Sequence, residues 1–395
     1  MLIGLVGKPS SGKSTLFNAL TMQNVPMASY PFTTIQPNLG AGYVRVDCAD
    51  KFFNVQCNPR TGYCVNHVRF VSVEIMDVAG LVPGASEGKG MGNAFLNDLR
   101  NADILIQVVD ASGRTNEEGE AAQPGTYNPC TEIEFLEKEL DLWFLSVIKK
   151  NFERFSKLPA KGKSEMVRLV SQYLAGISIK EHQVEECGSK LGLLEKQIRE
   201  WTEAELLEFS SMLRKKSKPI MIAANKADIP EAGNYIEEMK QKFPQLEIVE
   251  CSAISELTLK KAAKDGKISY NAGDGTYSEK EGLSEEQKKG LGYIKTNVLE
   301  KFGSTGVQKM LEKAVFEKLN YIAIFPGGTK KLTDSEGRVL PDCFLMPPGT
   351  TALDFAFRLH TDIGNGFIRA INVKSRQMIG KEHVLQSGDV VEIVF

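Results

Sequence analysis

The first pattern along the chain is a set of short apolar runs, each followed by a polar or glycine-rich segment. Three runs start before residue 105 and two follow residue 218: Leu2–Val6, Val71–Met76, Ile104–Val109, Pro219–Ala224 and Glu247–Cys251. Continuous runs of Ile, Val and Leu of this length are typical of parallel strands that are buried on both faces. We therefore predict an α/β domain with a mainly parallel sheet and helices on both of its faces.

The segment between the two groups of runs has a helical period instead. Apolar positions recur on one helical face across Ile133–Ile177, with breaks at Pro159 and Gly162. Two capping boxes, at Thr131–Glu134 and Thr202–Glu205, would each start a helix, because the Thr hydroxyl and the Glu carboxylate satisfy free backbone N–H groups. This pattern predicts a helical insertion within the α/β domain.

The last part of the chain changes character. Residues 264–283 are rich in Gly, Asp, Ser and Lys and predict a long mobile loop, followed by helices from about Ser284 and over Gly306–Leu319. Short strands and turns around one helix at Thr351–Leu359 come after that. The predicted domains are 1–130 with 218–262 (α/β), 131–217 (helical insertion), 263–318 (helical extension) and 319–395 (small, strand-rich).

The first apolar run leads into a complete phosphate-binding motif. Residues 7–14, GKPSSGKS, fit GxxxxGK[ST] between a predicted strand and a predicted helix. The glycines let successive N–H groups face an anion, and the helix N-terminus favours negative charge. Lys13 would reach the β- and γ-phosphates, and Ser14 would bind Mg²⁺. The expected nucleotide-binding residues are Gly7, Lys8, Pro9, Ser10, Ser11, Gly12, Lys13, Ser14 and Thr15.

A second motif, NKAD at 225–228, follows another apolar run. The carboxylate of Asp228 can accept both the N1–H and the N2–H₂ of guanine, whereas adenine offers neither donor in that arrangement. Asn225 would tie the base to the phosphate loop, and the methylene stem of Lys226 would lie over the purine. Ser252 and Ala253, after the next run, would present a backbone N–H to guanine O6. The two motifs in this order predict GTP or GDP as the bound nucleotide.

Two further segments fit a nucleotide switch. Asp77 ends a run and would hold a water on Mg²⁺, and the N–H of Gly80 would sense the γ-phosphate. The glycine-rich stretch after it is costly to order and suits a loop that the γ-phosphate orders. Upstream, Thr34 would supply another Mg²⁺ contact, in preference to Thr33. The predicted catalytic residues are thus Lys13, Thr34 and Gly80, and the predicted metal ligands are Ser14, Thr34 and Asp77.

The order of these features resembles a known family. The likeness rests on YPFTTIQPN at 30–38, DVAGLVPGASEGKGMGN at 77–93, the helical insertion, and a tail from Tyr321 through 349–356 to 388–393. The chain resembles Obg-class translation-factor-type GTPases, in particular the YchF (Obg-like ATPase) branch, and its tail resembles the TGS domain. This resemblance implies a P-loop GTPase domain, an inserted helical hairpin domain and a C-terminal β-grasp (TGS) domain.

Three positions refine that resemblance. Many YchF proteins lack the guanine-reading Asp, but this chain keeps Asp228, which favours GTP. Leu81 stands where Ras-like enzymes orient water with Gln, and Ser10 stands where potassium-activated relatives carry Asn. Phosphoryl transfer depends on positioning the reactants and on neutralising charge. Leu81 cannot hydrogen-bond a water, so nothing in the sequence visibly positions the attacking water. We therefore predict slow intrinsic GTP hydrolysis that a partner or ordered switch loops would accelerate.

Composition adds limits on partners and location. The net charge is −2, so we expect no global basic field. No apolar stretch approaches the ~18 residues of a membrane span, so we expect a cytoplasmic protein. We also expect a monomer. The predicted tip of the insertion is locally basic, with one acidic residue, Glu153, and two interleaved aromatics, Phe152 and Phe155. Its six basic residues are Lys149, Lys150, Arg154, Lys157, Lys161 and Lys163.

Two interpretations of the partner follow. The tip and the TGS-like tail could contact the ribosome or structured RNA, or the tip could be a solvated helix end whose Phe residues pack inward. The main functional hypothesis is a GTPase switch on ribosome or RNA. The alternative is an ATP- or GTP-binding regulator that acts on protein partners through the TGS-like tail.

The cysteines raise a separate question. Cys57, Cys64 and His67 lie in CNPRTGYCVNH, where a hairpin tip at 59–62 would bring the two cysteines together. We expect free thiols, since cytosolic disulfides are rare. A disulfide and a zinc site with Cys48 as an added ligand remain alternatives.

Overall fold

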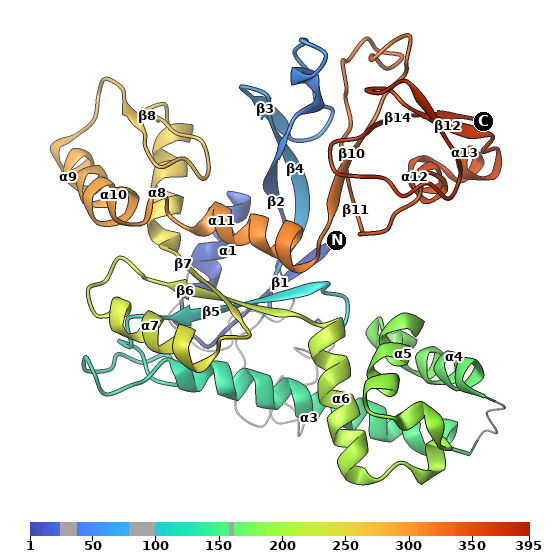
Figure 1. The fold of residues 1–395 in the computed structure, drawn as a ribbon. Helices are drawn as coiled ribbons and strands as arrows, with labels where there is room; N and C mark the ends of the chain where they lie inside the picture. The colour runs from blue at the N-terminus through green and yellow to red at the C-terminus, as the bar shows by residue number, and fades with distance from the viewer. Residues whose placement is uncertain (24–37, 79–98, 158–161) are drawn as a thin grey trace. The chain divides into compact units, whose positions relative to one another are not determined.

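The computed structural model of the chain describes residues 1–23, 38–78, 99–157 and 162–395 (Figure 1). The chain forms two compact units. The first comprises residues 1–40 and 74–310, and the second comprises 41–73 and 311–395. The grouping of 41–73 with the C-terminal residues has no counterpart in the domains predicted from sequence.

The first unit is built on a parallel sheet with the strand order β4-β1-β5-β6-β7. The strands are β1 (Leu2–Val6), β4 (Val68–Asp77), β5 (Ile104–Asp110), β6 (Ile220–Asn225) and β7 (Glu247–Glu250). Each residue of β5 and β6 is buried, as expected of central strands covered on both faces. The predicted fold class is therefore confirmed.

Helices cover both faces of this sheet (Figure 1). On one face α1 (Lys13–Thr21) packs against α8 (Ala253–Lys264), and on the other α3 (Cys130–Phe155) lies with α7 (Ala232–Lys242). Parallel strands all end at one edge of a sheet, so the segments that follow them gather at that edge. The candidate site lies there.

The insertion between β5 and β6 is helical, as predicted. Its helices are α3, α4 (Lys163–Leu174), α5 (Glu181–Lys190) and α6 (Glu203–Ser217), and 3₁₀ turns lie at Ala175–Ile177, Leu193–Glu195 and Ile198–Glu200. Their inner faces share an apolar core that includes Phe144 and Phe209. The buried Arg214 joins α6 to α3, because its Nε donates to Asp141 at 2.7 Å.

One of the two predicted capping boxes is present. Thr202 Oγ1 accepts the N–H of Glu205 at 3.3 Å, and the Glu205 carboxylate accepts the N–H of Thr202 at 2.8 Å. The box predicted at Thr131 is wrong, because α3 begins at Cys130, so Thr131 lies inside the helix and its Oγ1 donates to Asn128 O. Asn128 Oδ1 instead accepts the N–H of Cys130 at 2.9 Å, so an upstream side chain satisfies the helix start.

The segment 264–283 is a folded hairpin and not the long loop that the sequence predicted. Strands β8 (Ile268–Ser269) and β9 (Ser278–Glu279) pair antiparallel. Ile268 is buried, and Tyr270 Oη donates to the buried Glu256 at 2.7 Å. These contacts hold residues whose composition alone indicated a loop.

The helical extension follows this hairpin. Ser284 caps α9 with a capping box, as the predicted helix start requires. The elements are α9 (Glu285–Ile294), α10 (Glu300–Phe302) and α11 (Val307–Glu312), with π-helical turns at Lys295–Leu299 and Lys313–Lys318.

The second unit contains a five-stranded mixed sheet with the order β11-β10-β14-β12-β13. Its strands are β10 (Ile322–Pro326), β11 (Phe344–Met346), β12 (Arg369–Asn372), β13 (Gln377–Ile379) and β14 (Val390–Val394), and its helices are α12 (Ala352–Leu359) and α13 (Thr361–Asn365). Phe355 of α12 is fully buried on this sheet with Ile324 and Ala370. This arrangement is the predicted β-grasp module.

The same unit also takes in the segment 41–73. It contains most of β2 (Asn38–Asp47), the 3₁₀ turn Ala49–Lys51, β3 (Tyr63–Val65) and the first half of β4. Cys48 and Cys57 of this segment share a buried apolar cluster with Leu340 and Val390. Across the described parts of the chain, no helix has both the length and the apolar character needed to span a bilayer.

Candidate nucleotide-binding site

The phosphate-binding motif forms a tight loop between β1 and α1. Gly12 lies in the left-handed region at φ 92°, and a Cβ there would come within 2.2 Å of Asn225 Nδ2, so only glycine fits. Ser10 also has a positive φ of 60°. Ser11 is fully buried, and its Oγ has no hydrogen-bond partner among the described residues. The loop is thus a closely fitted cradle that contains an unsatisfied hydroxyl.

Lys13 and Ser14 both contact Asp77, at the end of β4. Lys13 Nζ lies 2.6 Å from Asp77 Oδ1, and Ser14 Oγ donates to Asp77 Oδ2 at 3.0 Å. Asp77 is 1% exposed. A hydroxyl and a carboxylate oxygen are the hard donors that Mg²⁺ prefers, so these two residues fit a magnesium site beside the phosphate loop.

Asn225 connects the phosphate loop to the segment after β7. Its Nδ2 donates to Ser11 O at 2.9 Å, and its Oδ1 accepts the N–H of Ala253 at 3.0 Å. The N–H of Ser252 donates to Thr305 O at 2.9 Å. Both N–H groups that the sequence assigned to guanine O6 therefore have partners inside the protein in this structure.

Lys226 is held in place by Asp110, which the sequence interpretation missed. Lys226 Nζ lies 2.7 Å from Asp110 Oδ2 and donates to Ser10 O at 3.1 Å. Asp110 also accepts hydrogen bonds from Ser112 and Thr115. Burial by itself would raise the pKa of Asp110, but the Lys226 ammonium and these hydrogen bonds lower it. Asp110 directly follows the predicted strand Ile104–Val109, and this position is the signal that could have identified it as a site residue.

Asp228 lies in the turn after β6 and is partly buried. Its Oδ1 is buried and has no hydrogen-bond partner in the described residues. A buried carboxylate oxygen without a donor is unfavourable by ~1–3 kcal/mol or more. An incoming group with N–H donors would remove that cost.

Lys8 of the phosphate loop contacts Glu132, at the start of the helical insertion. Its Nζ lies 2.9 Å from Glu132 Oε1 and 4.1 Å from the centre of the Tyr127 ring. The same amine donates to Thr115 O and to Asn116 O. The pKa of Glu132 is raised to about 8, because the effect of burial exceeds the opposing effect of the Lys8 ammonium. The sequence had given Lys8 only a place in the nucleotide loop.

Several predicted site residues lie outside the described residues. They are Thr33, Thr34, Gly80 and Leu81, together with most of the two switch segments at 30–38 and 77–93. Among the described residues, Lys13, Ser14 and Asp77 meet at one point.

Pro9 of the phosphate loop packs closely against Gly119, where a Cβ would lie 2.7 Å from Pro9 Cβ.

The basic tip of the insertion is partly neutralised. Lys149 lies 3.0 Å from Glu203, and Lys163 forms an ion pair with Glu195. Lys161 falls in the part of the chain that is not described. The positive charge of the tip is therefore smaller than the sequence alone indicated.

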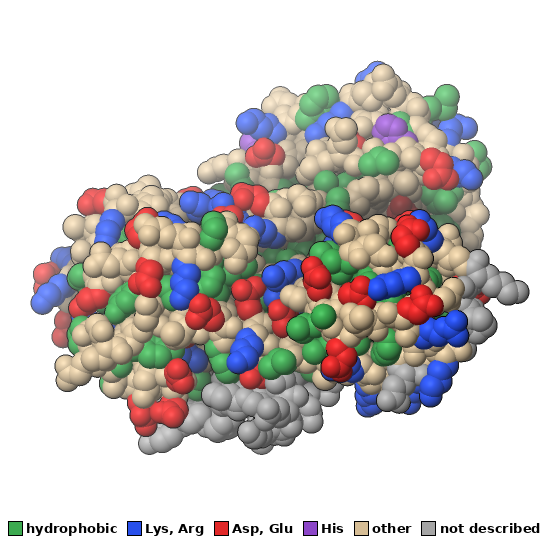
Figure 2. Space-filling model, turned by 60° about the horizontal axis from the view of Figure 1, so that its bottom comes forward, with side chains coloured by type: hydrophobic (Ala, Val, Ile, Leu, Met, Phe, Trp, Pro, Cys, Tyr) green, Lys and Arg blue, Asp and Glu red, His purple; other side chains and the backbone are tan. Residues whose placement is uncertain are grey.

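One of the two tip aromatics packs inward. The Phe152 ring lies 6.4 Å from the Trp201 ring, against the core of the insertion, as the alternative interpretation of a solvated helix end requires. The Phe155 side chain is not described. Figure 2 shows Lys and Arg side chains gathered at the lower right of one face of the molecule. Lys150, Arg154 and Lys157 are exposed, as are the ion-paired Lys149 and Lys163.

Three family models match successive parts of the chain. Residues 2–137 match the 50S ribosome-binding GTPase family. Residues 223–327 match the family described as Obg-like GTPase YGR210-like, G4 motif-containing domain. Residues 332–395 match the TGS domain.

Whole-length relatives agree with these matches. An uncharacterized GTP-binding protein of Methanocaldococcus jannaschii is 42% identical, and the alignment covers 100% of this chain and 98% of the relative. A protein named ribosome-binding ATPase YchF, from Escherichia coli O157:H7, is 27% identical over 99% of this chain and 98% of its own. The crystal structure of a GTP-binding protein from Pyrococcus horikoshii OT3 has a TM-score of 0.78 at 34% identity and covers 100% of this chain and 99% of that one.

Proposed function

The chain belongs to the YchF/Obg-like GTPase family, and on that premise we propose that it is a guanine-nucleotide switch. It binds GTP with Mg²⁺, hydrolyses it slowly to GDP and phosphate, and acts on the ribosome or another structured RNA in the cytoplasm. The observation that carries the choice of guanine is Asp228, whose Oδ1 is buried without a donor among the described residues.

Guanine would supply the missing donors. Its N1–H and N2–H₂ groups match the two oxygens of the Asp228 carboxylate, while adenine would leave the carboxylate unpaired. Lys226 lies beside the phosphate loop through Ser10 O, so its methylene stem is available to cover the purine. The Escherichia coli relative is named an ATPase, and in this chain Asp228 is the residue that favours guanine.

The phosphate end of the site would work by charge and position. Ser14 and Asp77 would hold Mg²⁺, which when bound neutralises negative charge on the phosphates. Lys13, which contacts Asp77 in the structure, would turn to the β- and γ-phosphates. Ser11, with its unsatisfied Oγ, and the N–H groups of the loop would complete the cradle.

Slow hydrolysis rests on the sequence of the switch segments. Leu81 cannot orient an attacking water, and Thr34 and Gly80 would report the γ-phosphate only when their segments are ordered. A partner that orders those segments would accelerate the reaction. The family description for residues 2–137 and the name of the Escherichia coli relative favour a ribosomal partner.

Calorimetry with GDP, ADP and non-hydrolysable GTP and ATP analogues tests the nucleotide part of this proposal. We expect GDP to bind at least 100-fold more tightly than ADP, which corresponds to roughly 2.7 kcal/mol. Equal affinities would refute guanine selection. Turnover of many GTP per second by the chain alone would refute slow intrinsic hydrolysis.

Co-sedimentation with ribosomes tests the partner. We expect more protein in the ribosome pellet with the GTP analogue than with GDP. Absence of the chain from the pellet in both states, in protein that still binds GDP, would favour the alternative in which the TGS domain recognises protein partners.

A further inference from the structure

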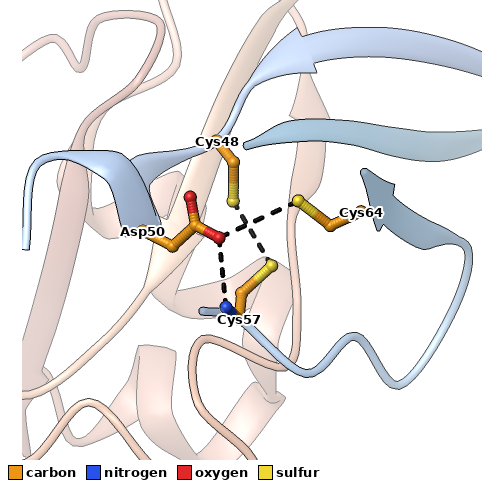
Figure 3. A group of neighbouring side chains, drawn as sticks. All are labelled: Cys48, Asp50, Cys57 and Cys64. Carbon is orange, nitrogen blue, oxygen red and sulfur yellow. Dashed lines mark hydrogen bonds between the residues drawn. The ribbon is translucent and has the colours of Figure 1, made fainter. Parts of the chain in front are cut away.

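Four side chains of the second unit converge on one point outside the nucleotide site (Figure 3). They are Cys48, which follows β2, Asp50 in the 3₁₀ turn, Cys57 in the following loop and Cys64 in β3. Three sulfur atoms and one carboxylate oxygen all lie within 4.8 Å of one another. The first three side chains are buried and Cys64 is half-buried.

The spacing of these atoms matches a tetrahedral metal site. Cys48 Sγ and Cys57 Sγ are 3.5 Å apart, and Cys64 Sγ is 3.8 Å from Asp50 Oδ2. In a zinc site with Zn–S distances of about 2.3 Å and Zn–O distances of about 2.1 Å, neighbouring ligand atoms lie roughly 3.6 to 3.8 Å apart. Two of the separations are already close to these values and all of them lie within 4.8 Å, so shifts of about 1 Å or less in the ligand-atom separations would bring the four groups around one ion.

The groups around this cluster orient and balance it. His67 Nδ1 lies 2.9 Å from Asp50 Oδ1, which leaves Oδ2 facing the sulfur atoms. The N–H of Cys57 also donates to Asp50 Oδ2 at 3.0 Å. Arg69 is 1% exposed, and its Nη1 lies 3.6 Å from Cys57 Sγ. A buried guanidinium offsets part of the negative charge that three thiolates and a carboxylate would bring.

We propose that Cys48, Asp50, Cys57 and Cys64 form a structural zinc site. Thiolate ligands select a soft or borderline divalent ion, and four protein ligands leave no open position for a reacting water. His67, which the sequence offered as a ligand, supports Asp50 instead. All seven cysteines of the chain are free thiols in the structure, so the sulfur atoms are available to a metal.

The site would brace the segment 48–64 against the β-grasp module of the same unit. In this segment the N–H of Asn58 donates to Val339 O at 2.8 Å, and the N–H of Arg60 donates to Pro341 O at 2.9 Å. Arg69 donates to the neighbouring carbonyls of Leu340 and Pro341. The segment 48–64 contains little regular secondary structure. A metal that fixes its two ends would therefore preserve these contacts.

Metal analysis of the full chain tests this site. We expect about one zinc per chain in protein grown with zinc and purified without chelator, and Cys57→Ser should lose it. Asp50→Asn should weaken zinc binding at least tenfold in competition with a chelator. Cys343→Ser is the matched control, because Cys343 is a free thiol of the same unit that lies outside the four-residue cluster.

Cobalt provides a readout that does not depend on how well the variants fold. Reduced wild-type chain freed of zinc should take up one Co²⁺ and develop the visible absorption of tetrahedral cobalt–thiolate coordination. Wild-type protein without zinc above trace and without this absorption would overturn the proposal. A Cys48–Cys57 disulfide in non-reduced native protein would overturn it too.

Discussion

Lys8 Nζ and Glu132 Oε1 lie 2.9 Å apart, with both side chains almost completely buried. Lys8 belongs to the phosphate loop and Glu132 to the first turn of α3, so this contact joins the nucleotide site to the start of the helical insertion. Lys8 is the partner of Oε1, whereas Oε2 of Glu132 has no hydrogen-bond partner among the described residues. Glu132 is therefore a buried carboxyl group that has few hydrogen-bond donors around it.

The first prediction concerns the pH dependence of stability. Burial raises the pKa of Glu132 from 4.5 to about 8, so between these values the folded state keeps a proton that the unfolded chain releases. Stability should consequently fall as pH rises from about 5 to 8. Glu132→Gln should remove this fall, which amounts to up to roughly 1.4 kcal/mol per pKa unit.

Urea unfolding at a series of pH values measures this effect. Glu134→Gln is the control, because Glu134 lies two residues further along α3 and is exposed, and it should follow the wild-type profile. A Glu132→Gln profile parallel to that of the wild type would contradict the raised pKa.

The second prediction concerns base selection by Asp228. Replacing its carboxylate by an amide in Asp228→Asn removes one acceptor for guanine, so GDP affinity should fall roughly 10- to 100-fold. Xanthosine diphosphate, whose base has a carbonyl at C2, should gain affinity because the amide can donate to it. Calorimetry with both nucleotides measures the change, and the exposed Asp265 provides the control Asp265→Asn. Parallel losses for both bases would point to a disturbed fold instead.

The third prediction concerns Asp110 as a positioning residue. Asp110→Asn weakens the contact that holds Lys226, at 2.7 Å from Oδ2, and the hydrogen bonds from Ser112 and Thr115. We expect GDP binding to weaken about tenfold or more, with a smaller effect on a triphosphate-only ligand such as inorganic tripolyphosphate. Competition calorimetry separates the two. Equal losses for GDP and tripolyphosphate would argue against a role at the base.

The fourth prediction concerns the insertion tip. Changing Lys150, Arg154 and Lys157 to Gln should reduce the salt dependence of ribosome binding. The slope of log K against log salt should fall in magnitude by roughly 0.7 to 0.9 for each phosphate that the tip no longer neutralises. A control triple variant at Lys138, Lys180 and Lys215 removes the same charge from positions elsewhere in the insertion. Identical slopes for the wild type and the tip variant would exclude the tip as an RNA-binding surface.

Much of the first unit could be predicted from sequence because its signals are contiguous. The apolar runs of β1, β5 and β6 are unbroken, and the motifs that follow β1 and β6 sit at fixed distances from them. A parallel sheet then brings Lys13, Asp77 and Asn225 to one edge without further information. The Thr202 capping box is equally local, and the structure contains it.

Other features depended on contacts that no local pattern encodes. The 264–283 hairpin is folded because Ile268 is buried and Tyr270 donates to the buried Glu256. The segment 41–73 packs with the β-grasp module, although the sequence places it within the nucleotide-binding domain. In each case the deciding free energy comes from interactions with residues outside the local pattern.

The sequence by itself determined the P-loop fold, the order of the nucleotide motifs and the C-terminal module, since each is written in neighbouring residues. Only the tertiary structure decided which buried polar groups meet: Lys8 with Glu132, Lys226 with Asp110, and Asp50 with three cysteines. The physical reason is that a buried charge or thiol is stable only beside a complementary group. That group can come from any part of the folded chain.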